Sequence, residues 1–138
     1  MIPQIGKCDI NGYSDEEMKI MQEVQKIIGE PLPISVTCVR VPVFVGHCSS
    51  INVELEGEYS LDEIRSALKE EKAIKLQENF NEYDTPIDVS GTNEVHISRL
   101  RKDTSNKKAV NFWLACDNLR KGAALNAVQI AEQLIAYI

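Results

Sequence analysis

Two apolar segments joined by a polar loop decide the fold of this chain, in the stretch VHISRLRKDTSNKKAVNFWLAC at residues 95–116. The segments at 95–101 and 110–116 have the apolar composition that is typical of β-strands. Between them, Asp103–Lys108 is polar and long enough to form a hairpin loop. The stretch therefore predicts an antiparallel β-hairpin.

The chain before this hairpin begins with a predicted helix and two predicted strands. Ser14 and Glu17 form a capping box that opens a helix at 14–28, where apolar residues recur at helical spacing. The β-rich segment 34–45 predicts a strand. Alternating apolar and polar residues at 51–56 predict a neighbouring, half-solvated strand.

A second capping box lies nearer the hairpin. Ser60 and Glu63 predict a short amphipathic helix, and a short strand is predicted at 74–76. The segment 79–93 is rich in Asp, Asn, Pro and Gly, so we expect a loop there.

The last segment of the chain predicts a helix. From about Leu119 to Ile138, apolar residues mark one wide face, broad enough to be covered by a sheet or by another domain. Strands grouped between helices indicate an α+β fold. We expect helices on one face of a mixed, mostly antiparallel sheet.

Length, charge and hydropathy limit the class of protein. The chain has 138 residues with 43% hydrophobic content, which predicts a single soluble domain with a real core. A formal net charge of −6 argues against a duplex nucleic acid or an anionic membrane as partner. No apolar stretch approaches the roughly 20 residues of a spanning helix, and no targeting segment opens the chain, so we expect a cytoplasmic protein.

The cysteines predict neither a metal site nor a local nucleophile. Cys8, Cys38, Cys48 and Cys116 form no C-x-x-C pair, and there are only two histidines. We expect reduced thiols and no metal. Cys48 follows His47 directly, but neighbours in an extended chain face opposite sides, so the imidazole does not activate this thiol.

Candidate functional groups bracket the apolar segment 40–47. Arg40 offers a rigid fork for a carboxylate or phosphate, or else an ion pair at a strand end. His47 suits a general acid/base, or else caps the edge of a sheet. On a regular strand the two would point to opposite faces, so a shared ligand requires a bend near Pro42 or Gly46. We expect such a bend and an open cleft.

Two further groups have a functional and a structural interpretation. Glu16 and Lys19 share a helix face and form either a polar grip on a ligand or a solvated surface pair. Asn118 lies where a strand joins the final helix. It can face a ligand there, or Asp117 or Asn118 can cap the helix.

Taken together, these residues resemble a known family. The resemblance spans almost the whole chain and rests on the order and spacing of several segments, which are Ile2–Ile5, Glu16–Lys19, Thr37–Val43, Gly46–His47, Thr85–Pro86 and Asp117–Ala124. They are similar to the C-terminal part of bacterial aspartate-semialdehyde dehydrogenases. That family reduces aspartyl phosphate to aspartate semialdehyde with NADPH, on the route to lysine, threonine and methionine.

The resemblance implies a role for each candidate. His47 matches the family's acid/base histidine, and Arg40 matches the arginine that binds the substrate carboxylate. Lys19 matches the lysine that contacts the phosphate. Glu16, rather than its neighbour Glu17, is expected to meet the substrate amino group. Asn118 falls where the nicotinamide end of NADP is contacted.

The resemblance also implies what this chain does not carry. Family members start with an NADP-binding domain, and their cysteine nucleophile lies near its junction with the catalytic domain. We therefore interpret residues 1–138 as the C-terminal catalytic and dimerisation domain of such an enzyme, inactive alone. The chain could be a cloned domain, a proteolytic product or one piece of a split protein.

The implied fold is that of the C-terminal domain of glyceraldehyde-phosphate dehydrogenases, with a sheet face that builds a homodimer. The implied ligands are aspartyl phosphate, aspartate semialdehyde and phosphate. The alternative is a non-catalytic interaction module that keeps the fold and the dimer face. A reductase of acetylglutamyl phosphate fits the segment 40–47 poorly.

Overall fold

The computed structural model describes residues 1–135 of this chain. They form two compact units, which are residues 1–42 and the described residues from 43 onward. The predicted apolar face of the last helix includes Ile138, which lies outside the described residues. The two units are described in turn below.

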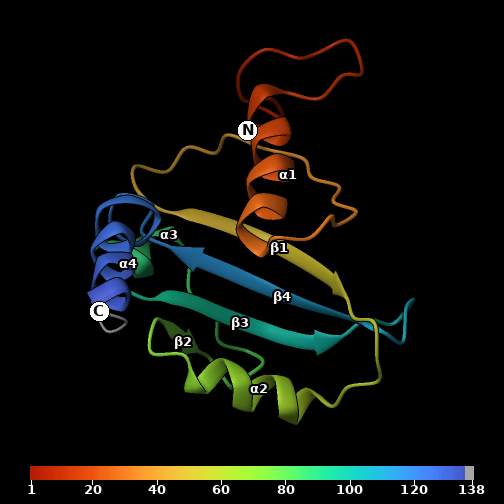
Figure 1. Cartoon of the computed structure of the whole chain (residues 1–138), viewed down its shortest axis with the longest axis vertical. Coiled ribbons are helices and arrows are strands. Elements are labelled where there is room, and N and C mark those ends of the chain that lie inside the picture. Colours follow the sequence, from red (N-terminus) through yellow and green to blue (C-terminus); the bar gives the residue numbers. More distant parts are fainter. Residues whose placement is uncertain (136–138) are drawn as a thin grey trace. The chain divides into compact units, whose positions relative to one another are not determined.

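The larger unit is built on a sheet of four strands in the order β1-β4-β3-β2 (Figure 1). β1 (His47–Glu54) and β3 (Val95–Lys102) both pair antiparallel with β4 (Ala109–Cys116). β2 (Ile74–Leu76) pairs parallel with β3. The predicted hairpin and the α+β class with a mixed, mostly antiparallel sheet are thus confirmed.

Asp103 holds the loop of this hairpin. Its Oδ1 accepts hydrogen bonds from the N–H of Ser105 at 2.6 Å and of Asn106 at 3.1 Å. Its Oδ2 accepts from the side-chain amides of Asn52 and Asn111, on the two strands β1 and β4. The Ser105 hydroxyl also donates to Oδ1, at 2.7 Å. This bond foremost, then those of Asn111 and of the two backbone N–H groups, holds the pKa of Asp103 far below its usual range.

β3 contains a bulge at its centre. Ser98 pairs with Trp113 but Arg101 pairs with Asn111, so Arg99 and Leu100 together oppose one residue of β4. Arg99 has φ +58°, in the left-handed region that non-glycine residues seldom adopt. Leu100 is buried while Arg99 remains exposed. The bulge thus keeps a guanidinium outside without removing the strand's leucine from the core.

Helices complete the larger unit. α2 (Leu61–Glu70) begins at the predicted capping box and packs on β2 and β3. Its position beside the edge strand is visible in Figure 1. The predicted final helix is present as a single π-helical turn, η1 (Arg120–Ala124), that continues into α4 (Leu125–Ile135). Several apolar side chains of α4 are exposed, which are Val128, Ile130, Leu134 and Ile135.

The prediction of a loop throughout 79–93 is wrong in one part. A short helix, α3 (Pro86–Val89), begins where the N–H and the hydroxyl of Thr85 both donate to Asp88. Proline at the first helical position also favours this start. Val89 is completely buried, so the short helix contributes to the core.

The smaller unit contains one helix, α1 (Asp15–Ile28), as predicted. The helix ends at Gly29, whose φ of +83° is the usual left-handed C-cap. The predicted strand at 34–45 is wrong. In the described part of the chain this segment pairs only through one isolated bridge, between Arg40 and Ile2.

The prolines explain why this β-rich segment forms no ladder. Pro33 and Pro42 have no N–H to donate, which interrupts the hydrogen bonding that a strand needs. No ladder therefore joins the segment to the predicted strand at 51–56, of which residues 51–54 belong to β1.

Candidate functional site

His47 is the first residue of β1 and is presented by an unusual turn. Gly46, just before it, has φ +101°, and a Cβ placed there would lie 3.1 Å from Cα of Pro86. Only glycine fits both the backbone angle and the space. The expected irregularity at Gly46 is therefore present, and the imidazole that follows it is exposed.

A hydrogen bond fixes this turn to the start of the last helical segment. The N–H of Gly46 donates to Oδ1 of Asn118 at 2.9 Å. Asn118 is thus held beside the backbone that carries His47. The two predicted site residues of the larger unit are brought together, although 71 positions separate them in the sequence (118 − 47 = 71).

The neighbouring Asp117 is the residue that caps this helical segment. Its Oδ1 accepts from the N–H groups of Leu119 and Arg120, and its Oδ2 accepts from Gly91. These bonds, that of Gly91 foremost, lower the pKa of the buried Asp117 carboxyl. Because Asp117 does the capping, the side chain of Asn118 is released to contact the Gly46 turn.

The other candidates lie in the smaller unit. Glu16 and Lys19 form an exposed ion pair on α1, with Nζ 3.3 Å from Oε1. Arg40 is exposed, and its backbone N–H and C=O both bond to Ile2, at 2.8 and 2.9 Å. The expectation that Arg40 and His47 face one cleft stays a prediction, because they belong to different units.

Glu17 differs sharply from its neighbour Glu16. Its side chain is buried, and its two carboxylate oxygens accept from the N–H of Ser14 at 2.7 Å and of Cys38 at 2.8 Å. A carboxylate committed to two amides is not available to a ligand. Of the two glutamates, only Glu16 therefore has an exposed carboxylate.

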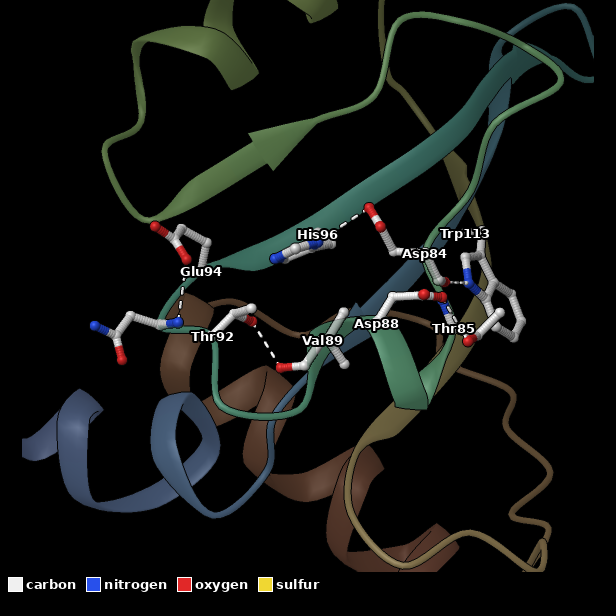
Figure 2. Close-up of polar contacts among 9 residues, drawn as sticks. Asp84, Thr85, Asp88, Val89, Thr92, Glu94, His96 and Trp113 are labelled. Atoms are coloured by element: carbon white, nitrogen blue, oxygen red, sulfur yellow. Dashed lines mark hydrogen bonds and ion pairs between the residues drawn. The ribbon is translucent and has the colours of Figure 1, made fainter.

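Sequence patterns did not reveal a buried pair in the larger unit, shown in Figure 2. Nδ1 of His96 lies 3.0 Å from Oδ2 of Asp84, and the His96 ring is almost completely buried. The backbone carbonyl of Asp84 also accepts from the indole N–H of Trp113 at 2.9 Å. The pair ties the segment before α3 to the sheet. Strand alternation places His96 and Trp113 on one face, but nothing local in the sequence indicates Asp84 as their partner.

The same face of the sheet carries a hollow of about 380 Å³. Two arginines from the bulged strand line it, Arg99 and Arg101, together with the aromatic rings of Tyr83 and Trp113. Both guanidinium groups are exposed. The hollow is therefore suited to an anionic group attached to an apolar or aromatic surface.

The thiols of this chain are unpaired and mostly shielded from water. All four are free, and burial raises the pKa of the Cys38, Cys48 and Cys116 thiols. Raised pKa values oppose thiolate formation, so Cys48 is unsuited to act as a nucleophile. Among residues 1–135 no cluster of His, Cys, Asp and Glu could hold a metal ion. In the same range, no helix is both long and apolar enough to cross a membrane.

Comparisons with known proteins show the family of this chain. Residues 1–121 match the family described as semialdehyde dehydrogenase, dimerisation domain. The aspartate-semialdehyde dehydrogenase of Rickettsia bellii is 47% identical over 98% of this chain and 40% of its own length. That of Rickettsia conorii is 46% identical with the same coverage.

Solved structures are similar as well. The crystal structure of aspartate semialdehyde dehydrogenase II from Vibrio cholerae, complexed with ASA, superposes with a TM-score of 0.92 at 41% identity, over 98% of this chain and 40% of that one. The mixed sheet and this likeness define an α+β domain of the dehydrogenase class. The chain belongs to the semialdehyde dehydrogenase dimerisation-domain family. It spans about two fifths of the length of the curated relatives it matches.

Proposed function

We propose that this chain supplies the substrate-binding and proton-transferring residues of an aspartate-semialdehyde dehydrogenase. The observation that carries the proposal is the hydrogen bond between Gly46 and Asn118, because it joins the backbone just before the exposed His47 to the side-chain amide expected at the nicotinamide. The relatives of this chain are named for the same activity.

The proposed reaction converts aspartyl phosphate, NADPH and a proton into aspartate semialdehyde, NADP and phosphate. The guanidinium of Arg40 binds the substrate carboxylate through two parallel hydrogen bonds, and the ammonium of Lys19 binds the phosphate. The carboxylate of Glu16 accepts from the substrate amino group. A ring nitrogen of His47 accepts and returns the proton that each step releases or consumes.

The residues present fit a nicotinamide at one point. Oδ1 of Asn118 is occupied by Gly46, which leaves its NH₂ group directed away from that bond and able to donate to the carboxamide oxygen of a nicotinamide. In the reductive direction NADPH, when bound, would supply the hydride. In this chain Asn118 would orient the ring, and His47 would move protons near it.

We further propose that the chain is the C-terminal catalytic and dimerisation part of the enzyme, and that it acts in the cytoplasm on the route to lysine, threonine and methionine. The nucleophilic cysteine and most of the NADP site would come from a separate nucleotide-binding part. The raised thiol pKa values of Cys38, Cys48 and Cys116 support a nucleophile from elsewhere. We therefore expect the chain alone to be inactive.

We propose a homodimer that forms through the sheet face bearing Trp113. The hollow on this face presents Arg99 and Arg101, although the chain as a whole carries a net charge of −6. An acidic side chain of a second copy would therefore be attracted to it. Sedimentation equilibrium of the chain should give a dimer mass that salt reduces, and a monomer at every concentration would contradict this part of the proposal.

The test of the enzymatic role is to mix the chain with a separately produced nucleotide-binding part of the Rickettsia bellii relative. With aspartate semialdehyde, phosphate and NADP, the mixture should form NADPH, whereas each component alone should not. His47→Gln is the control, since glutamine keeps hydrogen bonding without proton transfer near neutral pH.

The outcomes separate the two candidate functions. NADPH formation that requires His47 supports the enzyme. A mixture that associates but forms no NADPH contradicts it and favours a non-catalytic module that keeps the fold.

A further inference from the structure

Glu17 makes one hydrogen bond that its place in the helix does not require. In a capping box, the glutamate of the first turn bonds to the N-cap N–H, as Oε2 of Glu17 does with Ser14 at 2.7 Å. Its other oxygen, Oε1, accepts from the N–H of Cys38, which lies 21 residues further along the chain, at 2.8 Å. One carboxylate therefore joins the start of α1 to a distant extended segment.

Burial makes this contact demanding. Glu17 is only 6% exposed, and a buried carboxylate is stable only when hydrogen bonds replace its water. The two amides do so, and the bonds from Ser14 and Cys38 lower the pKa of Glu17. The carboxylate is thus kept ionised, with both oxygens occupied by backbone donors.

Cys38, whose N–H bonds to Glu17, lies two residues before Arg40. Arg40 itself is held from its other side, since its N–H and C=O both bond to Ile2. The peptide that carries the guanidinium is thus fixed at two neighbouring points. The anchor on the Cys38 side is Glu17, in the first turn of α1. Glu16 lies in the same turn, and Lys19 lies one turn further along the helix.

We propose that Glu17 is a positioning residue for substrate binding, which sets the Arg40 peptide at a fixed separation from Glu16 and Lys19. This inference rests on the proposed function, because it concerns the residues assigned there to the two ends of the substrate. The substrate carboxylate and phosphate are joined by a short carbon chain. Their binding groups must therefore be held at a matching separation before the substrate arrives.

The lack of sheet pairing in residues 34–42 explains why a residue that holds the Arg40 backbone is needed. Residues 34–42 belong to no sheet, so ladder hydrogen bonds do not hold them. Among the described residues, the backbone of residues 38–40 is held by two sets of hydrogen bonds. Arg40 bonds to Ile2, and Cys38 bonds to the side chain of Glu17. Loss of one of the two would leave Arg40 fixed at a single point.

The experiment compares Glu17→Gln with Glu23→Gln. Glutamine has one acceptor oxygen, so it can satisfy Ser14 or Cys38 but not both. Glu23 lies on the same helix and is exposed, and its side chain makes no hydrogen bond or ion pair within the described residues 1–135. Both variants lose one negative charge from α1, so the Glu23 variant controls for charge alone.

Two readouts are measured. In the chain alone, hydrogen exchange at the Cys38 amide should be about tenfold faster or more in Glu17→Gln, as expected for a lost hydrogen bond. In the mixture with the nucleotide-binding part, KM for aspartate semialdehyde should rise about tenfold or more with a smaller change in kcat. Unfolding of a fraction of the protein would instead lower the apparent kcat and leave KM unchanged.

Each outcome decides something. Unchanged exchange at both the Ser14 and the Cys38 amides in Glu17→Gln, a raised KM with unchanged Cys38 exchange, or faster Cys38 exchange with an unchanged KM would overturn the positioning role. If the wild-type mixture is inactive while Cys38 exchange is accelerated in the variant, the proposed function fails and the tie between Glu17 and Cys38 stands.

A measurement without a Glu17 variant covers the case in which that variant does not fold. In the wild-type chain, the chemical shift of the Cys38 amide proton should change with pH below the ordinary glutamate range, following the lowered pKa of Glu17. Glu16 on the same helix and the Cys38 thiol are the other titratable groups near this amide. Repeating the titration in Glu16→Gln removes the Glu16 carboxylate. The Cys38 thiol stays neutral in acid because its pKa is raised. A constant Cys38 shift in a folded protein would contradict the proposal.

Discussion

The two units of this chain hold the backbone of their candidate functional residues in a similar way but with different chemistry. In residues 1–42, the carboxylate of Glu17 holds the amide of Cys38, two positions before Arg40. In residues 43–138, the neutral amide of Asn118 holds the N–H of Gly46, one position before His47. In each unit, a polar side chain near the start of a helical segment thus fixes the backbone just before the candidate residue, Arg40 or His47.

The difference lies in what else holds the backbone. His47 begins a strand that is paired along its length with β4, whereas Arg40 has only an isolated bridge. The unit without a sheet depends on an ionised acceptor, and the unit with a sheet uses a neutral one. The backbone that carries Arg40 should therefore be sensitive to acid, and the backbone turn before His47 should not be.

The largest effect should come from Gly46→Ala in the larger unit. A residue with φ +101° and a Cβ 3.1 Å from Pro86 should lower the free energy of unfolding by about 1–3 kcal/mol. Urea unfolding followed by the fluorescence of Trp113, the only tryptophan, measures this change. Gly57→Ala is the matched control, because Gly57 has open space around it. Equal stability of the two variants would break the claim that the turn requires glycine.

Acid should reveal the next effect, in the smaller unit. Because the pKa of Glu17 is lower in the folded chain than in the unfolded chain, its contribution to stability is present above the ordinary glutamate pKa and is lost as pH falls through the folded value. The stability difference between wild type and Glu17→Gln should therefore be largest near neutral pH and shrink in acid. Urea titrations of both at several pH values test this. A stability difference that grows as the pH falls would contradict the lowered pKa of Glu17.

Asn118→Ala should have a smaller and pH-independent effect. The loss of one hydrogen bond to Gly46 should cost about 0.5–1.5 kcal/mol, with the same value at neutral and mildly acidic pH. Trp113 fluorescence again reports unfolding of this unit. A marked pH dependence of this difference would remove the contrast between the two units.

The smallest effect on stability should come from Lys19→Gln. An exposed ion pair with Glu16 contributes about 0.2–1 kcal/mol at most, so the free energy of unfolding should change little. If Lys19 binds phosphate, KM for phosphate in the mixture should nevertheless rise clearly. A large loss of stability with unchanged KM would assign Lys19 a structural role instead.

Local patterns predicted most of the fold. The capping boxes at Ser14 and Ser60 mark the starts of α1 and α2, and the alternation at 51–56 marks β1. Such signals depend on residues a few positions apart, which a sequence displays directly. The short α3 was missed because four residues are too few to show a helical period.

Tertiary contacts account for what the sequence did not predict. The segment 34–45 has the composition of a strand, but pairing requires N–H donors and a neighbour, and prolines remove some of the donors. The partners Asp84 and His96, or Glu17 and Cys38, meet only after folding. The choice of Glu16 over Glu17 as the ligand-facing carboxylate rested on a resemblance, and burial of Glu17 supplies the physical reason for it.

The most direct test of the account is a kinetic comparison of Arg40→Leu and His47→Gln in the chain mixed with its nucleotide-binding part. If Arg40 binds the substrate, its variant should raise KM for aspartate semialdehyde about tenfold or more. If His47 moves protons, its variant should lower kcat by about 10²–10⁴-fold with little change in KM. Activity that is unaffected by both substitutions would contradict the claim that the two units serve one reaction.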